Sequence, residues 1–233
     1  MKEGIRKRVL ELGADVCGFA SVERFVQAPE GFHPCDLYDD CKAVIVIGFA
    51  LPKSLFEVKP DLLYGYFNNL TIPKVDQLGM MTARIIEDAY GGTAVPVPCD
   101  APYDYWDTEK MEGRGLISMK HAAINAGIGT LGKNTLLLDT KFGNRLTVGV
   151  ILTNLELGSD DYAESICIEG CNLCIKNCPA QAIKEESVIQ KLCRNNAYGK
   201  TARGFDTVVC NKCRTVCPMR FGDKNYRDEI LYG

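Results

Sequence analysis

The sequence predicts a mixed α/β layer domain followed by a small ferredoxin-like domain. Apolar residues run without a break through 43–51, which is typical of a buried strand, and recur at helical spacing in flanking segments. Eight of the 12 cysteines lie late in the chain, after a polar and acidic stretch at 154–165. We therefore expect an α/β cofactor-binding domain over 1–160 and a ferredoxin-like domain over 161–233.

The composition is that of a folded protein without a strong net charge. The 233 residues include 27 Lys and Arg against 30 Asp and Glu, a formal charge of -3, and 46% are hydrophobic. This balance excludes a mainly disordered chain and lacks the positive charge of proteins that bind long nucleic acid. No apolar run approaches the roughly 20 residues of a membrane helix, and the N-terminus lacks a signal-peptide pattern. We expect a cytoplasmic protein with no membrane partner.

The first half of the predicted α/β domain alternates helices and strands. Residues 2–12 carry apolar side chains at helical spacing and are followed by Gly13, which predicts a helix with a glycine C-cap. Strands are expected over 15–20 and 43–51. A second helix is predicted over 74–90, where two glycines stop it.

The second half of this domain contains an edge strand, a loop and a hairpin. The segment 94–98 contains proline, which cannot donate to a strand ladder, so it is expected at a sheet edge. The aromatic and acidic stretch 100–115 shows no period and predicts a long loop that either caps a cofactor pocket or packs on the surface. A helix is expected over 116–126, and 135–139 and 145–153 are predicted to form a β-hairpin.

The late cysteines form two groups that resemble the bacterial two-cluster ferredoxin motif. That motif is Cys-x-x-Cys-x-x-Cys-x-x-x-Cys-Pro, in which the fourth cysteine ligates the other cluster. Both groups end in the three-residue gap and Cys-Pro, although the first has a longer opening gap and the second has a displaced leading cysteine. The groups are Cys167, Cys171, Cys174 and Cys178, and Cys193, Cys210, Cys213 and Cys217.

The spacing predicts two 4Fe-4S clusters that exchange their fourth ligands. One cluster is assigned to Cys167, Cys171, Cys174 and Cys217, and the other to Cys178, Cys193, Cys210 and Cys213. The alternative is a pair of structural zinc sites, which typically join two separated Cys-x-x-Cys knuckles. Because three or four cysteines crowd one short segment twice, the iron–sulfur interpretation is favoured. The other four cysteines are expected to be mostly buried, unreactive thiols.

A glycine-rich segment at 126–134 is the candidate for a further cofactor contact. Its glycines fit Gly-x-Gly-x-x-Gly, but they follow a helix and precede a strand, the reverse of the order in a dinucleotide-binding motif. The segment also lacks the spacing of a P-loop. Two alternatives remain: a helix C-cap at Gly127, or close approach of the backbone to a large flat cofactor. The candidate residues are Lys120, Gly127, Gly129, Gly132, Lys133 and Asn134.

The order of these motifs resembles the epoxyqueuosine reductase family over nearly the whole chain. The resemblance rests on LGADVCGFA, CKAVIVIGFAL, SMKHAAINAGIGTLGKNTLLL and VGVILTNLEL, followed by the eight-cysteine module. It implies a nitroreductase-like domain that binds cobalamin, fused to a two-cluster ferredoxin domain, a plan shared with reductive dehalogenases. The clusters are then expected to pass electrons to cobalt, and a protein acid to supply the proton.

The resemblance also suggests the acid. Family members place a catalytic Asp in a Val-Asp-x-Ala-Pro segment, and this chain has VPCDAP at 97–102. A shift of one residue brings Asp100 onto the family's aspartate, so Asp100 is the leading candidate. His121 and Asp104 are the next candidates, and the alternative for Asp100 is an ordinary turn residue.

The expected partners are an electron donor such as ferredoxin or flavodoxin and a small-molecule or modified-nucleoside substrate. Full-length reductases of the family carry a C-terminal helical-repeat region that helps to bind tRNA, whereas this sequence stops at Gly233. With a charge of -3 and no basic strip, tRNA is not expected as a substrate. The basic residues near the second cysteine group are interpreted as cluster-tuning or solvated: Lys212, Arg214, Arg220, Lys224 and Arg227.

Two other functions stay open. The α/β domain of an electron carrier or reductive activator would dock a partner protein and turn over no substrate. A flavin enzyme would use the same scaffold with FMN in place of cobalamin. A pocket of cofactor size distinguishes an enzyme from a carrier, because a carrier does not need one.

Overall fold

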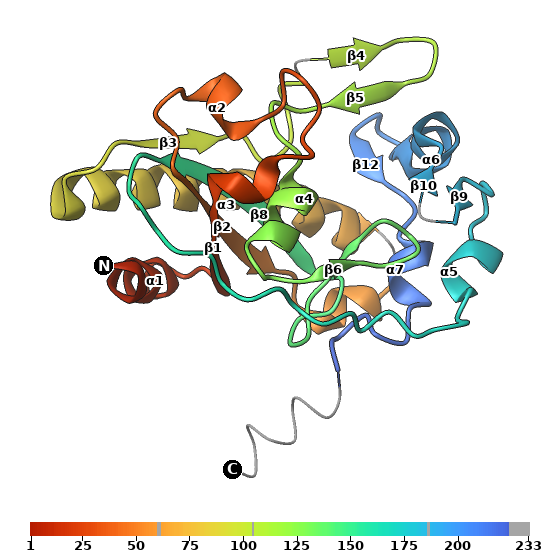
Figure 1. The fold of residues 1–233 in the computed structure, drawn as a ribbon. Coiled ribbons are helices and arrows are strands. Elements are labelled where there is room, and N and C mark those ends of the chain that lie inside the picture. Colours follow the sequence, from red (N-terminus) through yellow and green to blue (C-terminus); the bar gives the residue numbers. More distant parts are fainter. Residues whose placement is uncertain (60–61, 104, 186, 224–233) are drawn as a thin grey trace.

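A four-stranded antiparallel sheet forms the centre of the fold (Figure 1). The computed structural model describes residues 1–59, 62–103, 105–185 and 187–223. The strands follow the spatial order β1 (Val16–Ser21), β2 (Ala43–Ala50), β8 (Leu146–Thr153) and β3 (Ala94–Val97). The inner strands β2 and β8 are apolar along their length because both faces of the sheet are covered. Pro96 lies on the edge strand β3, as predicted.

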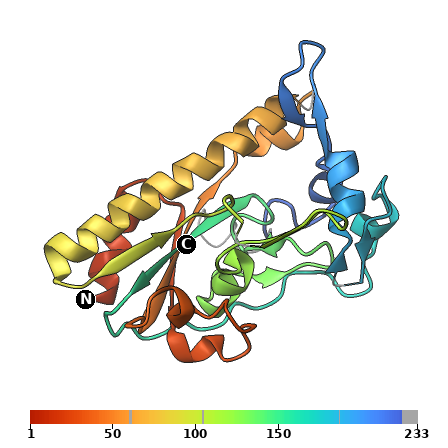
Figure 2. The ribbon, with the colours of Figure 1, turned by 90° about the horizontal axis from the view of Figure 1, so that it is seen from above.

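Helices cover both faces of the sheet. Helices α1 (Lys2–Glu11) and α3 (Leu62–Tyr90) pack their apolar side chains on one face, against Ile45 and Ile151 among others. On the other face, α4 (Met119–Asn125) packs against Val46 and Val150, and α2 (Pro34–Leu37) lies beside it. Figure 2 shows the sheet between α3 and these shorter helices. The expected mixed α/β architecture is therefore confirmed, as three layers.

The predicted hairpin of 135–139 with 145–153 is wrong. Strand β8 pairs with β2 along its whole length and with β3 over Val150–Thr153, and not with residues 135–139. These residues instead contain β7 (Leu137–Leu138), which pairs with the short strand β6 (Thr130–Leu131). Sequence alternation did not reveal which strand would occupy the edges of β8.

Two other boundaries differ from the prediction. Helix α3 begins at Leu62 and passes through Pro73, whereas the apolar period alone placed its start near residue 74. The predicted loop over 100–115 contains a small hairpin of β4 (Tyr105–Asp107) and β5 (Glu112–Arg114). Both segments pack against the cysteine-rich region, a contact that local periodicity does not record.

The cysteine-rich region consists of short elements around its thiols. Few of its apolar side chains are buried; Ala182 and Ile183 are. Its elements are α5 (Leu173–Lys176), β9 (Ile183–Lys184), β10 (Ser187–Val188), α6 (Gln190–Ala197), β11 (Tyr198–Lys200), β12 (Asp206–Val208) and α7 (Lys212–Thr215). No helix in the described parts of the chain has the length and apolar character to cross a membrane.

Asp160 joins the N-terminal helix to the sheet. Its carboxylate lies 2.6 Å from Lys2 Nζ and 2.8 Å from Arg6 Nη2, and accepts a hydrogen bond of 3.0 Å from the Phe19 amide. Burial raises the pKa of Asp160, but the hydrogen bonds and charges of Lys2 and Arg6 outweigh it and hold the pKa below its ordinary 3.8. The carboxylate therefore stabilises the fold when it is ionised.

We expect Asp160→Asn to lower the free energy of unfolding at pH 7 by about 1–3 kcal/mol, the range for hydrogen bonds to a charged group. Because the folded pKa is depressed, this contribution is present above the ordinary pKa and is lost as the pH falls through the folded value. Anaerobic urea unfolding from pH 7 to pH 3 measures it. A difference between the two proteins that stays constant down to pH 3 would contradict the role.

Candidate redox site

The first of two thiol sets surrounds a small pocket. The pocket is lined by Cys167, Cys171, Cys174 and Cys217, together with Gly132, Lys133 and Asn134. Burial raises the pKa of Cys217, and the three other thiols of the set raise it further. Cysteines that are far apart in the sequence therefore lie together, in the combination expected from the ferredoxin motif.

The second thiol set consists of Cys178, Cys193, Cys210 and Cys213. Burial raises the pKa of Cys213 to about 11; nearby Arg214 lowers it, and the other three thiols raise it. The pKa of Cys193 is also raised by burial and by Cys178 and Cys210. Each set thus draws its members from both cysteine groups of the sequence.

Two short helices connect the sets. Helix α5 carries Cys174, and Cys178 follows one turn later; α7 carries Cys213, and Cys217 follows in the same way. Each Cys-x-x-x-Cys-Pro segment thereby contributes one cysteine to each set. Helices α5 and α7 pack against each other. Within the described residues, no group of three or more His, Cys, Asp or Glu side chains is arranged to hold a single metal ion.

Part of the glycine segment lies at the first thiol pocket. Besides lining it, Asn134 donates a hydrogen bond of 3.1 Å from Nδ2 to the Cys213 carbonyl, and Lys133 donates one of 3.3 Å to Asn172. Gly127 follows α4 at a φ of 70°, where a Cβ would lie 2.1 Å from the Asp161 carbonyl oxygen. The segment joins the sheet domain to the cysteine-rich region.

Lys120 and His121 lie on the exposed side of α4. Lys120 Nζ donates a hydrogen bond of 2.7 Å to the Thr135 carbonyl. Although part of its side chain is exposed, desolvation of the amine and then the charge of Arg214 lower its pKa. His121 Nδ1 lies 2.7 Å from Ser118 Oγ. Neither side chain lines the larger cavity described next.

A cavity of about 690 Å³ opens between the first part of α3 and the β11–β12 hairpin. Its size is within the range of ligand-binding sites. Tyr64, beside the wall residues Leu63 and Gly65, is close to the second thiol set: burial raises its pKa, Arg214 lowers it, and Cys213 and Cys210 raise it. The wall is made by Leu62, Leu63, Gly65, Tyr66, Asn69, Leu70, Pro73, Thr201, Phe205, Asp206 and Thr207.

Asp100 follows β3, and the residue before it contacts α3 next to the cavity wall. The preceding residue, Cys99, donates from its amide to Asp76 Oδ1 over 2.9 Å, and its thiol contacts the Ile72 carbonyl, next to Pro73. Burial, Asp76 and then Asp100 raise the pKa of Cys99 to about 12, so its thiol is protonated at neutral pH. The Tyr103 hydroxyl donates a hydrogen bond of 3.1 Å to the exposed carboxylate of Asp100.

Arg194 connects Asp100 to the second thiol set and was not among the predicted residues. It follows Cys193, and its guanidinium lies 5.6 Å from the Tyr103 ring and 5.1 Å from the Trp106 ring. Burial lowers the pKa of Arg194, but the Tyr103 hydrogen bond and nearby charges, including Asp100, raise it above its usual value. An arginine next to a cysteine of the second thiol set, together with an aromatic segment at 103–106, was the available sequence signal.

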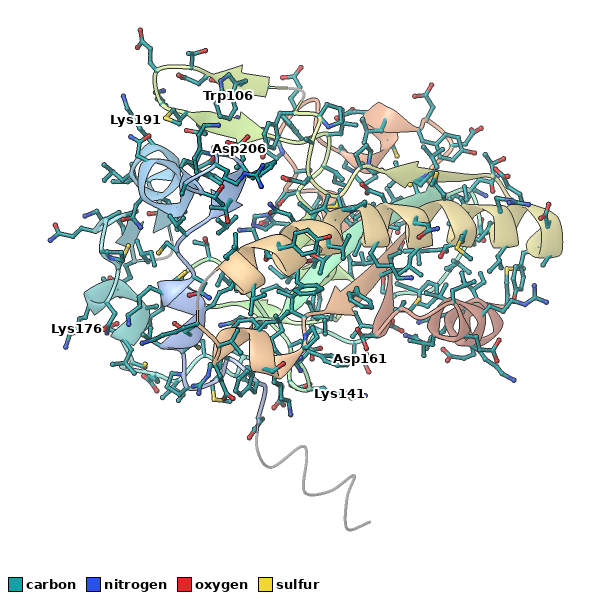
Figure 3. The ribbon with its side chains drawn as sticks, turned by 180° about the vertical axis from the view of Figure 1, so that it is seen from behind. Trp106, Lys141, Asp161, Lys176, Lys191 and Asp206 are labelled. Carbon is teal, nitrogen blue, oxygen red and sulfur yellow. The ribbon has the colours of Figure 1, made fainter. Side chains whose placement is uncertain are left out.

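The β4–β5 hairpin therefore packs on α6 instead of forming an open loop. Tyr103 and Trp106 stack with ring centroids 5.8 Å apart, and the Gly113 amide donates to Gln190 Oε1 over 3.2 Å. Figure 3 shows Trp106 above the helix that carries Lys191. Asp104, the remaining candidate acid, and Lys224 and Arg227 lie outside the described residues.

We expect Arg194→Ala to loosen this hairpin, because it removes cation–π contacts of about 0.5–1 kcal/mol each. Trp106 is the only tryptophan in the chain, so its fluorescence reports on the hairpin directly. Its emission should shift to longer wavelength and its quenching by iodide should increase, as expected when a packed segment loosens. Lys191→Ala, on the exposed side of α6, is the control; equal spectra for all three proteins would contradict the contact.

The chain is similar to epoxyqueuosine reductases over much of its length. No protein-family model matches it. The epoxyqueuosine reductase of Lactococcus garvieae is 25% identical over 256 residues, covering 95% of this chain and 70% of the relative. That of Listeria monocytogenes is 29% identical over 143 residues, covering 52% of this chain and 35% of the relative. The chain thus spans about a third of the length of several curated relatives it matches.

Solved structures share the fold. An epoxyqueuosine reductase crystallised with an epoxyqueuosine-modified tRNA-Tyr stem loop has a TM-score of 0.67 at 17% identity, covering 95% of this chain and 66% of that one. A reductive dehalogenase whose structure suggested a mechanism for B12-dependent dehalogenation has a TM-score of 0.65 at 16% identity, covering 98% and 33%. The resemblance to the epoxyqueuosine reductase family is confirmed, and its named members are oxidoreductases.

The expectation that tRNA is unsupported as a partner is contradicted by the stem-loop complex. That relative is an epoxyqueuosine reductase bound to tRNA, and its fold includes nearly all of this chain. The expectation was wrong because the net charge of -3 averages over the whole surface, whereas RNA contacts depend on the local charge.

Proposed function

We propose that this chain is an iron–sulfur reductase that passes electrons through two 4Fe-4S clusters to a corrinoid cofactor and reduces a modified nucleoside in an RNA stem loop. The observation that carries the proposal is the placement of the second thiol set, which adjoins the first through α5 and α7. It also lies near Tyr64 of α3, between Leu63 and Gly65 in the wall of a cavity of about 690 Å³. An electron carrier has no need of such a cavity.

The thiol sets suit 4Fe-4S clusters, each of which takes four cysteine thiolates. Tetrahedral zinc would draw four sulfurs to about 2.3 Å from one ion. The described side chains include no group arranged in that way, whereas the first set lines a pocket. We assign the first set and the second set to one cluster each. Burial and the packing of α5 on α7 hold the thiols in place.

The apolar cavity suits a large flat cofactor. Leu63, Leu70 and Pro73 of α3 would contact its ring. A corrinoid, when bound, supplies a strongly reducing cobalt centre, and the B12-dependent dehalogenase with the same fold supports this choice. FMN in the same cavity is the second candidate, because the apolar wall residues would contact either ring system.

Asp100 is the proposed proton donor. Its carboxyl group is exposed toward solvent, and the Tyr103 hydroxyl orients it. Tyr103 is itself held by Arg194, which follows the cluster ligand Cys193. This chain of contacts keeps the acid beside the region through which electrons arrive. His121 lies on the exposed side of α4 and is the weaker candidate.

The substrate class comes from the relatives. The curated relatives are epoxyqueuosine reductases, and one protein of that name was crystallised with a modified tRNA stem loop. Reduction of an epoxide requires two electrons and two protons and releases water when the C–O bonds break. Two clusters can deliver the electrons singly, and a carboxyl group can deliver a proton.

The test begins with anaerobic purification and measurement of iron, sulfide and zinc. About eight iron atoms per chain, the content of two 4Fe-4S clusters, would support the assignment. Titration with cob(II)alamin followed by EPR, beside a titration with FMN, then identifies the cofactor. Turnover of an epoxyqueuosine-modified stem loop completes the test. Iron without a response to either cofactor would favour the electron carrier, and zinc in place of iron would overturn the proposal.

A further inference from the structure

We infer that residues 189–209 form an arm that holds the loop nucleotides of RNA at the mouth of the cavity. The inference rests on the proposed function and identifies the surface that would bind its substrate. The arm consists of α6 and the β11–β12 hairpin. In Figure 2 the hairpin, in blue, projects from the body beside the first turns of α3.

The arm is basic, although the chain as a whole is acidic. It carries Lys191, Arg194, Lys200 and Arg203 against one acidic residue, Asp206, while the formal charge of the chain is -3. Lys200 Nζ lies 2.7 Å from Asp206 Oδ1 across the hairpin, and that pair is exposed. Arg194 packs on the β4–β5 hairpin. Lys191 and Arg203 leave the arm with a positive local charge, which is what phosphate groups require.

The same arm exposes aromatic rings. Tyr198 is 58% exposed and Phe205 is 64% exposed, and the Arg203 guanidinium lies 5.8 Å from the centre of the Phe205 ring. Exposed rings next to guanidinium groups are the usual platform on which unpaired bases stack, because every base has a flat π-face.

The position of the arm links RNA binding to the proposed chemistry. Phe205 and Thr201 of the arm form one wall of the cavity, and Tyr66, which is 63% exposed, belongs to the opposite wall on α3. A base stacked on Phe205 would therefore place its neighbour in the RNA loop at the cavity.

An acidic electron-donor protein is the other partner that a basic arm would suit. The exposed rings favour RNA, because base stacking uses the open ring faces that line both sides of the cavity. Charge attraction to a donor protein would need the basic residues but not Phe205.

The experiment measures binding of a fluorescent RNA stem loop to the anaerobically purified full chain, without reductant, by anisotropy at several salt concentrations. We expect Phe205→Ala to weaken binding about tenfold, as for loss of one stacked base, and Phe205→Trp to restore it. The double variant Lys200→Gln/Arg203→Gln should reduce the slope of log affinity against log salt by about 1 to 2. The matched control is Lys7→Gln/Arg84→Gln, which removes two exposed basic residues from α1 and α3.

The outcomes separate this inference from the proposed function. RNA binding that depends on Phe205 but not on the control pair supports the arm, even if no substrate is reduced. If the modified stem loop is reduced and RNA binding is unchanged in all arm variants, the RNA-binding role of the arm is overturned. The proposed reductase function would still be supported. Slower cluster reduction by an acidic flavodoxin in the double variant, with RNA affinity unchanged, would identify the arm as a donor site and also overturn the inference.

Discussion

Cys213→Ala is expected to remove one cluster and abolish turnover. Cys213 belongs to the second thiol set, beside the cavity, so its loss interrupts electron transfer before the proposed cofactor. Iron should fall from about eight to about four atoms per chain, because one 4Fe-4S cluster needs four thiolates. Iron and sulfide analysis with EPR of the remaining cluster measures this. Cys35→Ser, at a thiol outside both sets, is the control and should retain its iron.

Double variants test how the cysteines are divided between the sets. Cys178→Ala/Cys213→Ala removes two ligands from one set and should retain about four iron atoms. Cys174→Ala/Cys213→Ala removes one ligand from each set and should lose nearly all of the iron. Equal iron in the two double variants would contradict the exchange of ligands between the cysteine groups.

Asp100→Asn is expected to lower turnover by about 10²–10⁴-fold, the contribution of a general acid. The side chain keeps its size and can still accept the hydrogen bond from Tyr103, so the loop should remain in place. Iron content and cofactor binding should stay at wild-type levels, which separates loss of the acid from loss of the site. Single-turnover reduction of the modified stem loop measures the effect.

The matched control for this variant is Asp88→Asn, at an exposed position late in α3. It makes the same chemical change away from the cavity and should retain full turnover. Tyr103→Phe should produce a smaller loss than Asp100→Asn, because it removes the orienting hydroxyl and leaves the acid. Wild-type turnover in Asp100→Asn would contradict its role and would direct attention to His121.

Much of the fold follows from local patterns in the sequence. The apolar run at 43–51, the helical stripe at 2–12 and the proline in 94–98 each predict an element close to its observed bounds. These patterns arise because a buried strand, an amphipathic helix and an edge strand impose different requirements on neighbouring residues. The cysteine spacing similarly predicted two sets whose members the structure brings together, because ligands of one site must reach a common point.

Only the tertiary structure determined which distant segments meet. Strand β8 lies between β2 and β3, so the predicted hairpin does not form; the early start of α3 and the packing of β4–β5 depend on the cysteine-rich region. The role of Arg194 and the cavity near the second thiol set could be identified only in the structure, because both depend on residues that are far apart in the sequence. The sequence by itself determined the local elements and the candidate ligands, because these depend on near neighbours. The site around Asp100 depends on long-range contacts, which local periodicity does not encode.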